Sequence, residues 1–218
     1  FIFNIFNYHQ MSCEIENRYV IEVYDKIADR FSKTRGYIWG GVKTFINSLD
    51  KHSHILDAGC GNGKNMFRKD CSFIGTDISS EMIKIINTKG LNGIIADIRN
   101  LPFNDNTFDA VISVAVLHHI YSKNPENDGR IKAIKELIRV TKSGGQIFIQ
   151  VWENMKNKNE KFERIKDNDY LVKWDNMDGN VYKRYYHLFD RDEFINLFNN
   201  IINIQIISVK YEMENWII

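Results

Sequence analysis

Apolar residues recur along this chain at two spacings, and segments of the two kinds alternate. Five apolar runs have the length of a buried strand: 54–58, 73–77, 93–97, 110–116 and 146–152. Three segments carry apolar residues at helical spacing: 15–31, 39–49 and 131–140. A further helix is expected over 82–87, because Ser79-Ser80-Glu81 before it is typical of a helix start. Strands that alternate with helices predict an α/β fold, a mostly parallel sheet with helices on both faces.

Two regions depart from this alternation. Near the C-terminus, 203–209 and 215–218 read as a pair of strands, and 210–214 is too short to cross over between parallel strands. We therefore expect an antiparallel sheet edge there. The stretch 156–183 is charged, rich in asparagine and without a clear period. We interpret about 153–185 as an insertion at the rim of a site rather than a second domain.

Size and charge limit the classes of protein that remain. The 218 residues suit one domain, which we place over 14–218. The 29 basic and 28 acidic residues nearly cancel, so bulk charge favours neither a nucleic acid nor a membrane as partner. Three cysteines without C-x-x-C spacing are typical of reduced thiols in a cytosolic protein and argue against a zinc site in this chain.

The first residues are treated apart from the domain. The apolar run at 1–6 is too short to span a bilayer and lacks the basic segment of a signal peptide. Met11 is an alternative initiator. We interpret 1–13 as an N-terminal extension that is disordered or not native.

A glycine-rich turn follows the first expected strand, in Leu56-Asp57-Ala58-Gly59-Cys60-Gly61-Asn62-Gly63. Alternate glycines let the backbone turn sharply and approach a ligand closely. A dinucleotide-binding turn would need glycine where Lys64 stands, and a phosphate-binding P-loop would need a hydroxyl residue where Asn65 stands. The remaining alternative to a ligand site is a tight turn that binds nothing.

An acidic residue ends each of the next two expected strands. Asp77 stands 20 residues after Asp57, where a carboxylate can accept both ribose hydroxyls of a nucleoside; alone it could equally favour a helix N-terminus. Asp97 can accept an adenine amino proton while Ile98 packs on the ring, with a simple turn cap as the alternative. Together with the glycine turn, these acids predict a nucleoside-containing cofactor.

This combination resembles the class I methyltransferases that bind S-adenosylmethionine, and the likeness covers residues 54–152. It implies a Rossmann-like, mostly parallel seven-stranded sheet with an antiparallel edge strand, and S-adenosylhomocysteine as product. One departure is the helix expected over 64–71, which is short. The cofactor-binding residues that the likeness implies are Asp57, Gly59, Gly61, Gly63, Asp77, Ile78, Asp97, Ile98 and Val114.

Outside that core the chain resembles the eukaryotic tRNA wobble-uridine carboxymethyl methyltransferases, which esterify 5-carboxymethyluridine in the anticodon. The likeness extends from about residue 19 to the C-terminus. Its weak part is the pattern Tyr24-Asp25-x-Ile27-Ala28-x-x-Phe31, which many small-molecule methyltransferases share. Its selective parts are Thr34-Arg35 with Trp39, Leu117-His118-His119, and Arg184-Tyr185-Tyr186-His187.

A carboxylate acceptor is already ionised at neutral pH, so its methylation needs alignment and exclusion of water rather than a strong base. The resemblance implies that Arg35 and Arg184 grip the acceptor's carboxylate or a nearby phosphate, although spacing alone would favour surface ion pairs. His118 is expected to orient the acceptor. The residues expected to contact the substrate are Trp39, His119, Tyr185, Tyr186 and His187. His119 has a packed structural role as its alternative, and the last three could stack on a base or only pack at the rim.

The resemblance also implies a heterodimer with a small zinc-binding activator protein, which supplies the zinc and covers an apolar sheet edge formed here by 93–96 and 73–74.

Two basic clusters, over 30–43 and 123–142, favour a tRNA substrate but equally suit a solvated helix face. We expect a cytoplasmic protein that could also enter the nucleus. The alternatives are a small-molecule O- or N-methyltransferase and a cofactor-binding scaffold without activity.

Overall fold

The computed structural model describes residues 14–122, 128–155, 158–177 and 179–218. The predicted N-terminal extension, 1–13, lies outside the described residues, as does Lys123 at the start of the second basic cluster.

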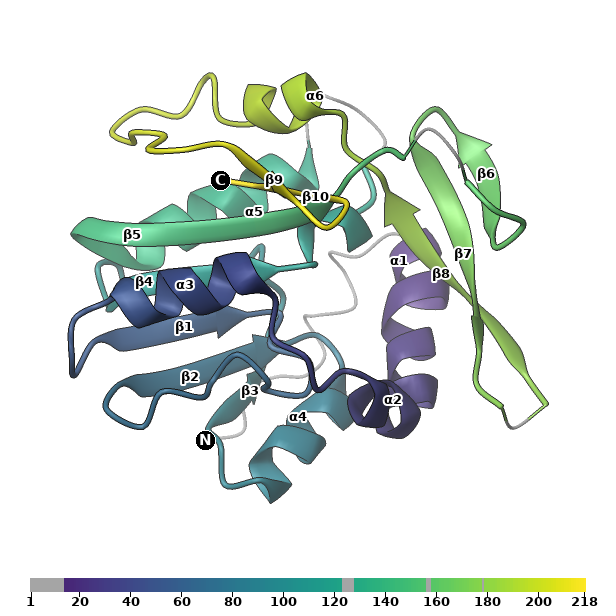
Figure 1. Cartoon of the computed structure of the whole chain (residues 1–218), viewed down its shortest axis with the longest axis horizontal. Coiled ribbons are helices and arrows are strands. Elements are labelled where there is room, and N and C mark those ends of the chain that lie inside the picture. The colour runs from purple at the N-terminus through teal and green to yellow at the C-terminus, as the bar shows by residue number, and fades with distance from the viewer. Residues whose placement is uncertain (1–13, 123–127, 156–157, 178) are drawn as a thin grey trace.

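Seven strands form the main sheet, in the order β3-β2-β1-β4-β5-β10-β9 (Figure 1). The strands are β1 His54–Ala58, β2 Ser72–Asp77, β3 Gly93–Ile95, β4 Phe108–Val114, β5 Thr141–Trp152, β9 Lys210–Glu212 and β10 Asn215–Ile217. The pairs among β1 to β5 are parallel, whereas β10 runs antiparallel to both β5 and β9. The predicted mostly parallel seven-stranded sheet with an antiparallel edge is confirmed.

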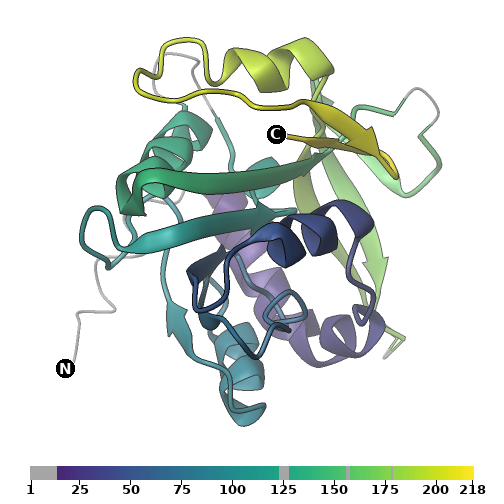
Figure 2. The same cartoon turned by 60° about the vertical axis from the view of Figure 1, so that its left-hand side comes forward.

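Helices cover both faces of this sheet (Figures 1 and 2). They are α1 Glu14–Glu16, η2 Asn17–Ile21, α2 Glu22–Thr34, α3 Gly40–Ser48, α4 Ser80–Thr88, η3 Leu117–His119, α5 Gly129–Val140 and α6 Arg191–Asn196. Ile55 of β1 shares a buried cluster with Val42 of α3 and Ile86 of α4, while the next residue, Leu56, packs with Leu137 of α5. Successive strand residues point to opposite faces, so a sheet covered on both sides requires the continuous apolar runs that the sequence shows.

The N-terminal helix is fixed to the sheet through the start of α4. Ser79 caps α4 as predicted, because its hydroxyl oxygen accepts a 3.2 Å hydrogen bond from the Met82 N–H. The same hydroxyl donates to Asp25 Oδ1 of α2 at 2.6 Å. One serine therefore joins α2 and α4 beside the end of β2.

Residues 64–71 form turns and irregular structure, so the prediction of a helix there is wrong. The Arg68 guanidinium donates to the Ile46 and Leu49 carbonyls at 2.8 and 2.7 Å, at the C-terminal end of α3. These contacts hold the segment against α3 in place of a helix of its own.

The C-terminal hairpin is shifted from its predicted position. Its strands are β9 and β10 rather than 203–209 and 215–218, because the chain reverses at Met213 and Glu214. Both turn residues have positive φ, 48° and 60°, and a two-residue turn of this kind brings the flanking residues into register. The predicted antiparallel edge is therefore present, but it begins later in the chain.

A second sheet of three antiparallel strands occupies most of the range predicted as an insertion and ends two residues beyond it. Its strands are β6 Phe162–Lys166, β7 Asp169–Asp175 and β8 Val181–His187. Figures 1 and 2 show it beside α1 and α2, near the end of the main sheet at which the parallel strands terminate. We call it the rim sheet. Its position makes it a wall of the site described next.

Candidate cofactor and acceptor site

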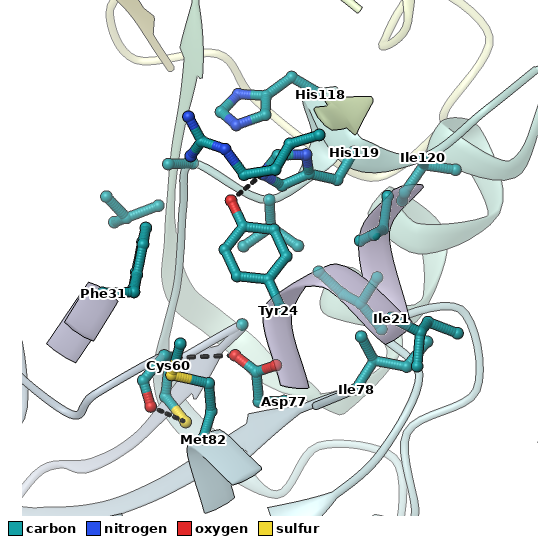
Figure 3. Close-up of a pocket in the computed structure, with 18 of the residues that line it drawn as sticks. Ile21, Tyr24, Phe31, Cys60, Asp77, Ile78, Met82, His118, His119 and Ile120 are labelled. Carbon is teal, nitrogen blue, oxygen red and sulfur yellow. Dashed lines mark hydrogen bonds between the residues drawn. The ribbon is translucent and has the colours of Figure 1, made fainter. Parts of the chain in front are cut away.

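A cavity of about 180 Å³ lies at the carboxyl ends of the parallel strands, between the glycine turn, the N-terminal helix and the rim sheet. The predicted site residues that line it are Arg35, Trp39, Gly59, Gly61, Asp77, Ile78, Asp97, Ile98, Val114, His118, His119, Arg184 and Tyr186. Figure 3 shows Asp77 and Ile78 at one end, His118 and His119 at the other, and Tyr24 between them. The predicted residues that do not line the cavity are Asp57, Gly63, Tyr185 and His187.

The three glycines of the turn have different surroundings, although all have positive φ. A Cβ on Gly59 would lie 2.1 Å from Val116 Cγ2, and one on Gly63 would lie 2.7 Å from Leu91 Cδ1. A Cβ on Gly61 would meet no atom within 4 Å. Gly59 and Gly63 are therefore required by packing, whereas Gly61 faces the open space that a ligand can enter.

Asp77 is held rigidly at this end of the cavity. Its Oδ2 accepts from the Gly61 N–H at 2.8 Å, and its Oδ1 accepts from the Ser79 N–H at 2.9 Å. Burial raises its pKa, and the two backbone donors oppose the shift. Each carboxylate oxygen can accept a second hydrogen bond, so Asp77 can bind a pair of hydroxyl groups without moving.

Asp57 lies behind the wall of the cavity, fully buried at the end of β1. Neither of its carboxylate oxygens has a hydrogen-bond partner among the described residues. Burial, and then the charge of Asp77, raise its pKa to about 7, while the nearby Asn65 side chain opposes the shift. A cationic ligand in the adjacent cavity would favour the ionised form.

Asp97 lines the cavity but is already engaged by Arg99. Its Oδ1 accepts from the Arg99 backbone N–H and Nε–H at 2.8 and 3.0 Å, and its Oδ2 accepts from Nη2–H at 2.6 Å. Arg99 also donates to both carboxylate oxygens of Glu16 in α1, at 3.1 and 2.8 Å. An adenine amino group that binds Asp97, as predicted, therefore has to share the carboxylate oxygens with Arg99. Sequence patterns missed Arg99 and Glu16, which are 83 residues apart.

The two histidines at the opposite end have defined tautomers. His119 Nδ1 lies 2.7 Å from the Tyr185 carbonyl oxygen, so it must donate, and Nε2 then accepts from the Tyr24 hydroxyl at 2.8 Å. His118 Nδ1 accepts from the Trp152 N–H at 3.3 Å, so its Nε2 carries the proton. Burial first, then neighbouring charges, lower the pKa of both rings, to about 3 for His119. Neutral His118 can therefore donate one hydrogen bond, whereas both ring nitrogens of His119 are already hydrogen-bonded within the fold.

Arg184 is a buried cation without an acidic partner. It is 4% exposed, and no carboxylate within the described parts of the chain forms an ion pair with it. Its Nε has no hydrogen-bond partner there, and its guanidinium lies 5.1 Å from the Tyr186 ring centroid. A buried charge is costly unless it is paired, so this arrangement is suited to an anionic ligand.

Comparisons with known proteins agree with this geometry. Residues 56–149 match a family model described as a methyltransferase domain. A tRNA (carboxymethyluridine(34)-5-O)-methyltransferase from Schizosaccharomyces pombe is 33% identical over 227 residues, which cover 94% of this chain and 97% of the relative. The chain belongs to this methyltransferase family.

Other relatives are longer than this chain. A tRNA (carboxymethyluridine(34)-5-O)-methyltransferase from Arabidopsis thaliana is 46% identical over 162 residues, covering 74% of this chain but only 37% of the relative. Among solved structures, a methyltransferase from Methanosarcina mazei matches with a TM-score of 0.64 at 24% identity, covering 83% of this chain and 95% of that one. A protein from Pyrococcus horikoshii matches with the same TM-score at 18% identity, covering 80% and 84%. These structures share the fold.

Two residues of the family-like Arg184–His187 segment do not contact the cavity, which corrects their prediction as base-stacking residues. Tyr185 is fully buried and donates from its hydroxyl to Asp169 Oδ1 at 2.7 Å. The His187 ring nitrogens lie 2.6 Å from Asp169 Oδ1 and 2.6 Å from Glu193 Oε1. Carboxylates only accept, so both nitrogens donate and His187 is an imidazolium that joins β7, β8 and α6.

Replacing His187 by glutamine should therefore destabilise this methyltransferase in a pH-dependent way. Burial lowers the pKa of His187, but the hydrogen bonds that its ring donates to the Asp169 and Glu193 carboxylates outweigh this effect and raise the pKa. The stabilisation is present below the unfolded pKa of about 6.5 and is lost as pH rises through the raised folded pKa. Chemical denaturation should show a loss of about 3 kcal/mol at pH 6 that shrinks at pH 9. His54→Gln is the matched control, and an equal loss at both pH values would contradict an imidazolium.

Proposed function

We propose that this chain transfers a methyl group from S-adenosylmethionine to the carboxylate of 5-carboxymethyluridine at the wobble position of tRNA. The observation that carries the proposal is buried Arg184, which has no acidic partner among the described residues and lies at one end of a cavity whose other end presents Asp77. A cationic cofactor fits the acidic end, and an anionic acceptor fits the basic end. The names of the relatives supply the identity of the acceptor.

The residues of the acidic end fit the cofactor. Gly61 leaves open space beside its backbone, and Asp77 offers a fixed carboxylate for ribose hydroxyls. Burial raises the pKa of Asp57 behind the cavity wall, and a positively charged ligand in the cavity would favour its ionised form. When bound, S-adenosylmethionine supplies an electrophilic methyl carbon on a positively charged sulfur.

The residues of the basic end orient the acceptor. Arg184 holds one carboxylate oxygen, and His118 Nε2–H donates to the carboxylate or the uracil. The other carboxylate oxygen is left free to face the cofactor end, where S-adenosylmethionine, once bound, would supply the methyl carbon and leave as S-adenosylhomocysteine. No proton is transferred, which agrees with the lowered pKa values of both histidines. Alignment and exclusion of water supply the catalysis.

An activator protein at the β3 edge belongs to the same proposal. Ile94 and Ile95 are 41% and 40% exposed on this edge strand, and an exposed apolar edge favours pairing with another chain. A methyltransferase that matches this chain with a TM-score of 0.50 and 20% identity, covering 62% of this chain and 61% of that one, was solved in complex with the Haloferax volcanii Trm112 activator. We propose a small zinc-binding activator of this kind as the partner in a cytoplasmic heterodimer.

Several of the basic side chains that the sequence offered for tRNA binding are engaged in ion pairs. Within the described part of the second basic cluster, Arg130, Arg139 and Lys142 are ion-paired with acids of this chain. In the first cluster Lys33 pairs with Asp29. The proposal therefore depends on the cations at the cavity more than on a basic surface.

The test is methyl transfer to defined tRNA. The chain, co-expressed with its activator, is incubated with labelled S-adenosylmethionine and tRNA that bears 5-carboxymethyluridine, and nucleosides are analysed by mass spectrometry. The methyl ester should form only on carboxymethylated tRNA. Cofactor binding without ester would leave a small-molecule methyltransferase or an inactive scaffold as the function.

A further inference from the structure

Trp174 of the rim sheet contacts both arginines of the site. The Arg184 Cζ lies 4.8 Å from its ring centroid, and the Arg35 Cζ lies 5.1 Å from it. Trp174 is on β7, opposite Tyr182 of β8, and its ring packs 5.7 Å from Phe31 of α2. One indole therefore meets cations that come from the end of α2 and from β8.

Arg184, which is buried, and Arg35, which is partly buried, differ from the other two buried arginines of the described chain. Arg99 and Arg130 are paired with acids at 2.6 and 2.7 Å. No carboxylate of the described residues pairs with Arg35 or Arg184; their charged groups lie on aromatic rings instead. A carboxylate would neutralise the charge, whereas an aromatic face attracts a guanidinium and leaves it positive. The side chains of Tyr24 and Tyr186 also hydrogen-bond Arg184 without neutralising it.

The charge at this end of the cavity is correspondingly positive. Arg184 adds to the effect of burial in lowering the pKa of both histidines. Two guanidinium groups without acidic partners suit a ligand with two negative charges. A 5-carboxymethyluridine nucleotide has two, its carboxylate and its backbone phosphate.

We propose that Trp174 is a positioning residue that holds Arg184 for the acceptor's carboxylate and Arg35 for a phosphate of the same nucleotide. This inference rests on the proposed function and deepens it: the indole makes the site selective for an acidic over an uncharged 5-substituent. The Trp174 Nε1 has no hydrogen-bond partner within the described residues, so phenylalanine keeps the aromatic face and loses no bond.

The experiment compares two anticodon stem-loop RNAs that differ only in the wobble substituent, 5-carboxymethyl or its uncharged carboxamide. Binding to the heterodimer loaded with S-adenosylhomocysteine is measured by fluorescence anisotropy for wild type, Trp174→Phe and Trp174→Leu. Cofactor affinity, measured by calorimetry, serves as the control for folding. Trp174→Met, which fills the space with a flexible side chain, replaces the leucine variant if that variant does not fold.

Wild type should bind the acid RNA at least tenfold more tightly than the amide RNA. The preference of Trp174→Phe for the acid RNA should lie within threefold of the wild-type preference. Trp174→Leu should bind the acid RNA less than threefold more tightly than the amide RNA, with unchanged cofactor affinity. A leucine variant with the wild-type preference, or a phenylalanine variant as impaired as leucine, overturns the role of Trp174 alone. If wild type binds both RNAs equally well, the proposal that the acceptor is a carboxylate is wrong, and so is the role of Trp174 in holding the two arginines for it.

Discussion

Replacing Arg184 by methionine should lower kcat/KM on carboxymethylated tRNA by about 30- to 5000-fold while leaving the free protein equally or more stable. Truncating one partner of a buried, hydrogen-bonded charge pair costs about 2–5 kcal/mol, which gives this range. In the free protein the same guanidinium is buried without an acidic partner among the described residues, so its removal relieves a desolvation cost. A residue that only maintained the fold would show the opposite effect on stability.

The measurement is steady-state kinetics of ester formation together with thermal unfolding of the free protein. Lys183→Met is the matched control, because Lys183 is the preceding residue of β8 and is paired with Glu163 at 2.6 Å on the surface. Its kcat/KM should stay within threefold of wild type. Arg184→Met with normal kinetics, or with a large fall in melting temperature, would contradict the assignment of Arg184 to the acceptor's carboxylate.

Replacing Asp77 by asparagine should weaken binding of S-adenosylhomocysteine by about 100-fold. Both carboxylate oxygens accept backbone hydrogen bonds, so the amide must turn an N–H group toward either the Gly61 or the Ser79 N–H. A hydrogen bond to a charged group contributes about 1.5–3 kcal/mol. The Asp77→Asn variant would lose one bond to a backbone N–H, and the ribose hydroxyls would lose the carboxylate that accepts their hydrogen bonds.

Isothermal titration calorimetry checks this result. Asp70→Asn is the control, because Asp70 pairs with Arg68 outside the cavity and undergoes the same chemical change. Its affinity for the cofactor product should be unchanged. An Asp77→Asn affinity within threefold of wild type would show that the ribose binds elsewhere.

The sequence predicted the main sheet well because its signals are local. Alternating apolar runs place β1, β2 and β4 to within a few residues, and Ser79 caps α4 as its position indicates. The errors arose where contacts between residues far apart in the sequence determine the local structure. Arg68 binds the end of α3, so the segment after the glycines forms no helix, and the turn at Met213 moves the last hairpin along the chain.

The site was predictable to a similar degree. Gly61, Asp77, Arg184 and His118 follow motifs and line the cavity. The Glu16–Arg99 pair and the contacts of Trp174 join segments far apart in the chain, and no spacing rule marks them. His187 was misassigned for the same reason, because only the fold brings Asp169 and Glu193 to its two ring nitrogens.

The most direct test of the account is a crystal structure of the heterodimer with S-adenosylhomocysteine and an anticodon stem-loop bearing 5-carboxymethyluridine. The account predicts ribose hydroxyls on Asp77, and the acceptor's carboxylate about 2.7–2.9 Å from Arg184 nitrogens and facing the cofactor sulfur. A carboxylate directed to solvent, with Arg184 bound to a phosphate or to nothing, would contradict the division of the cavity into an acidic cofactor end and a basic acceptor end.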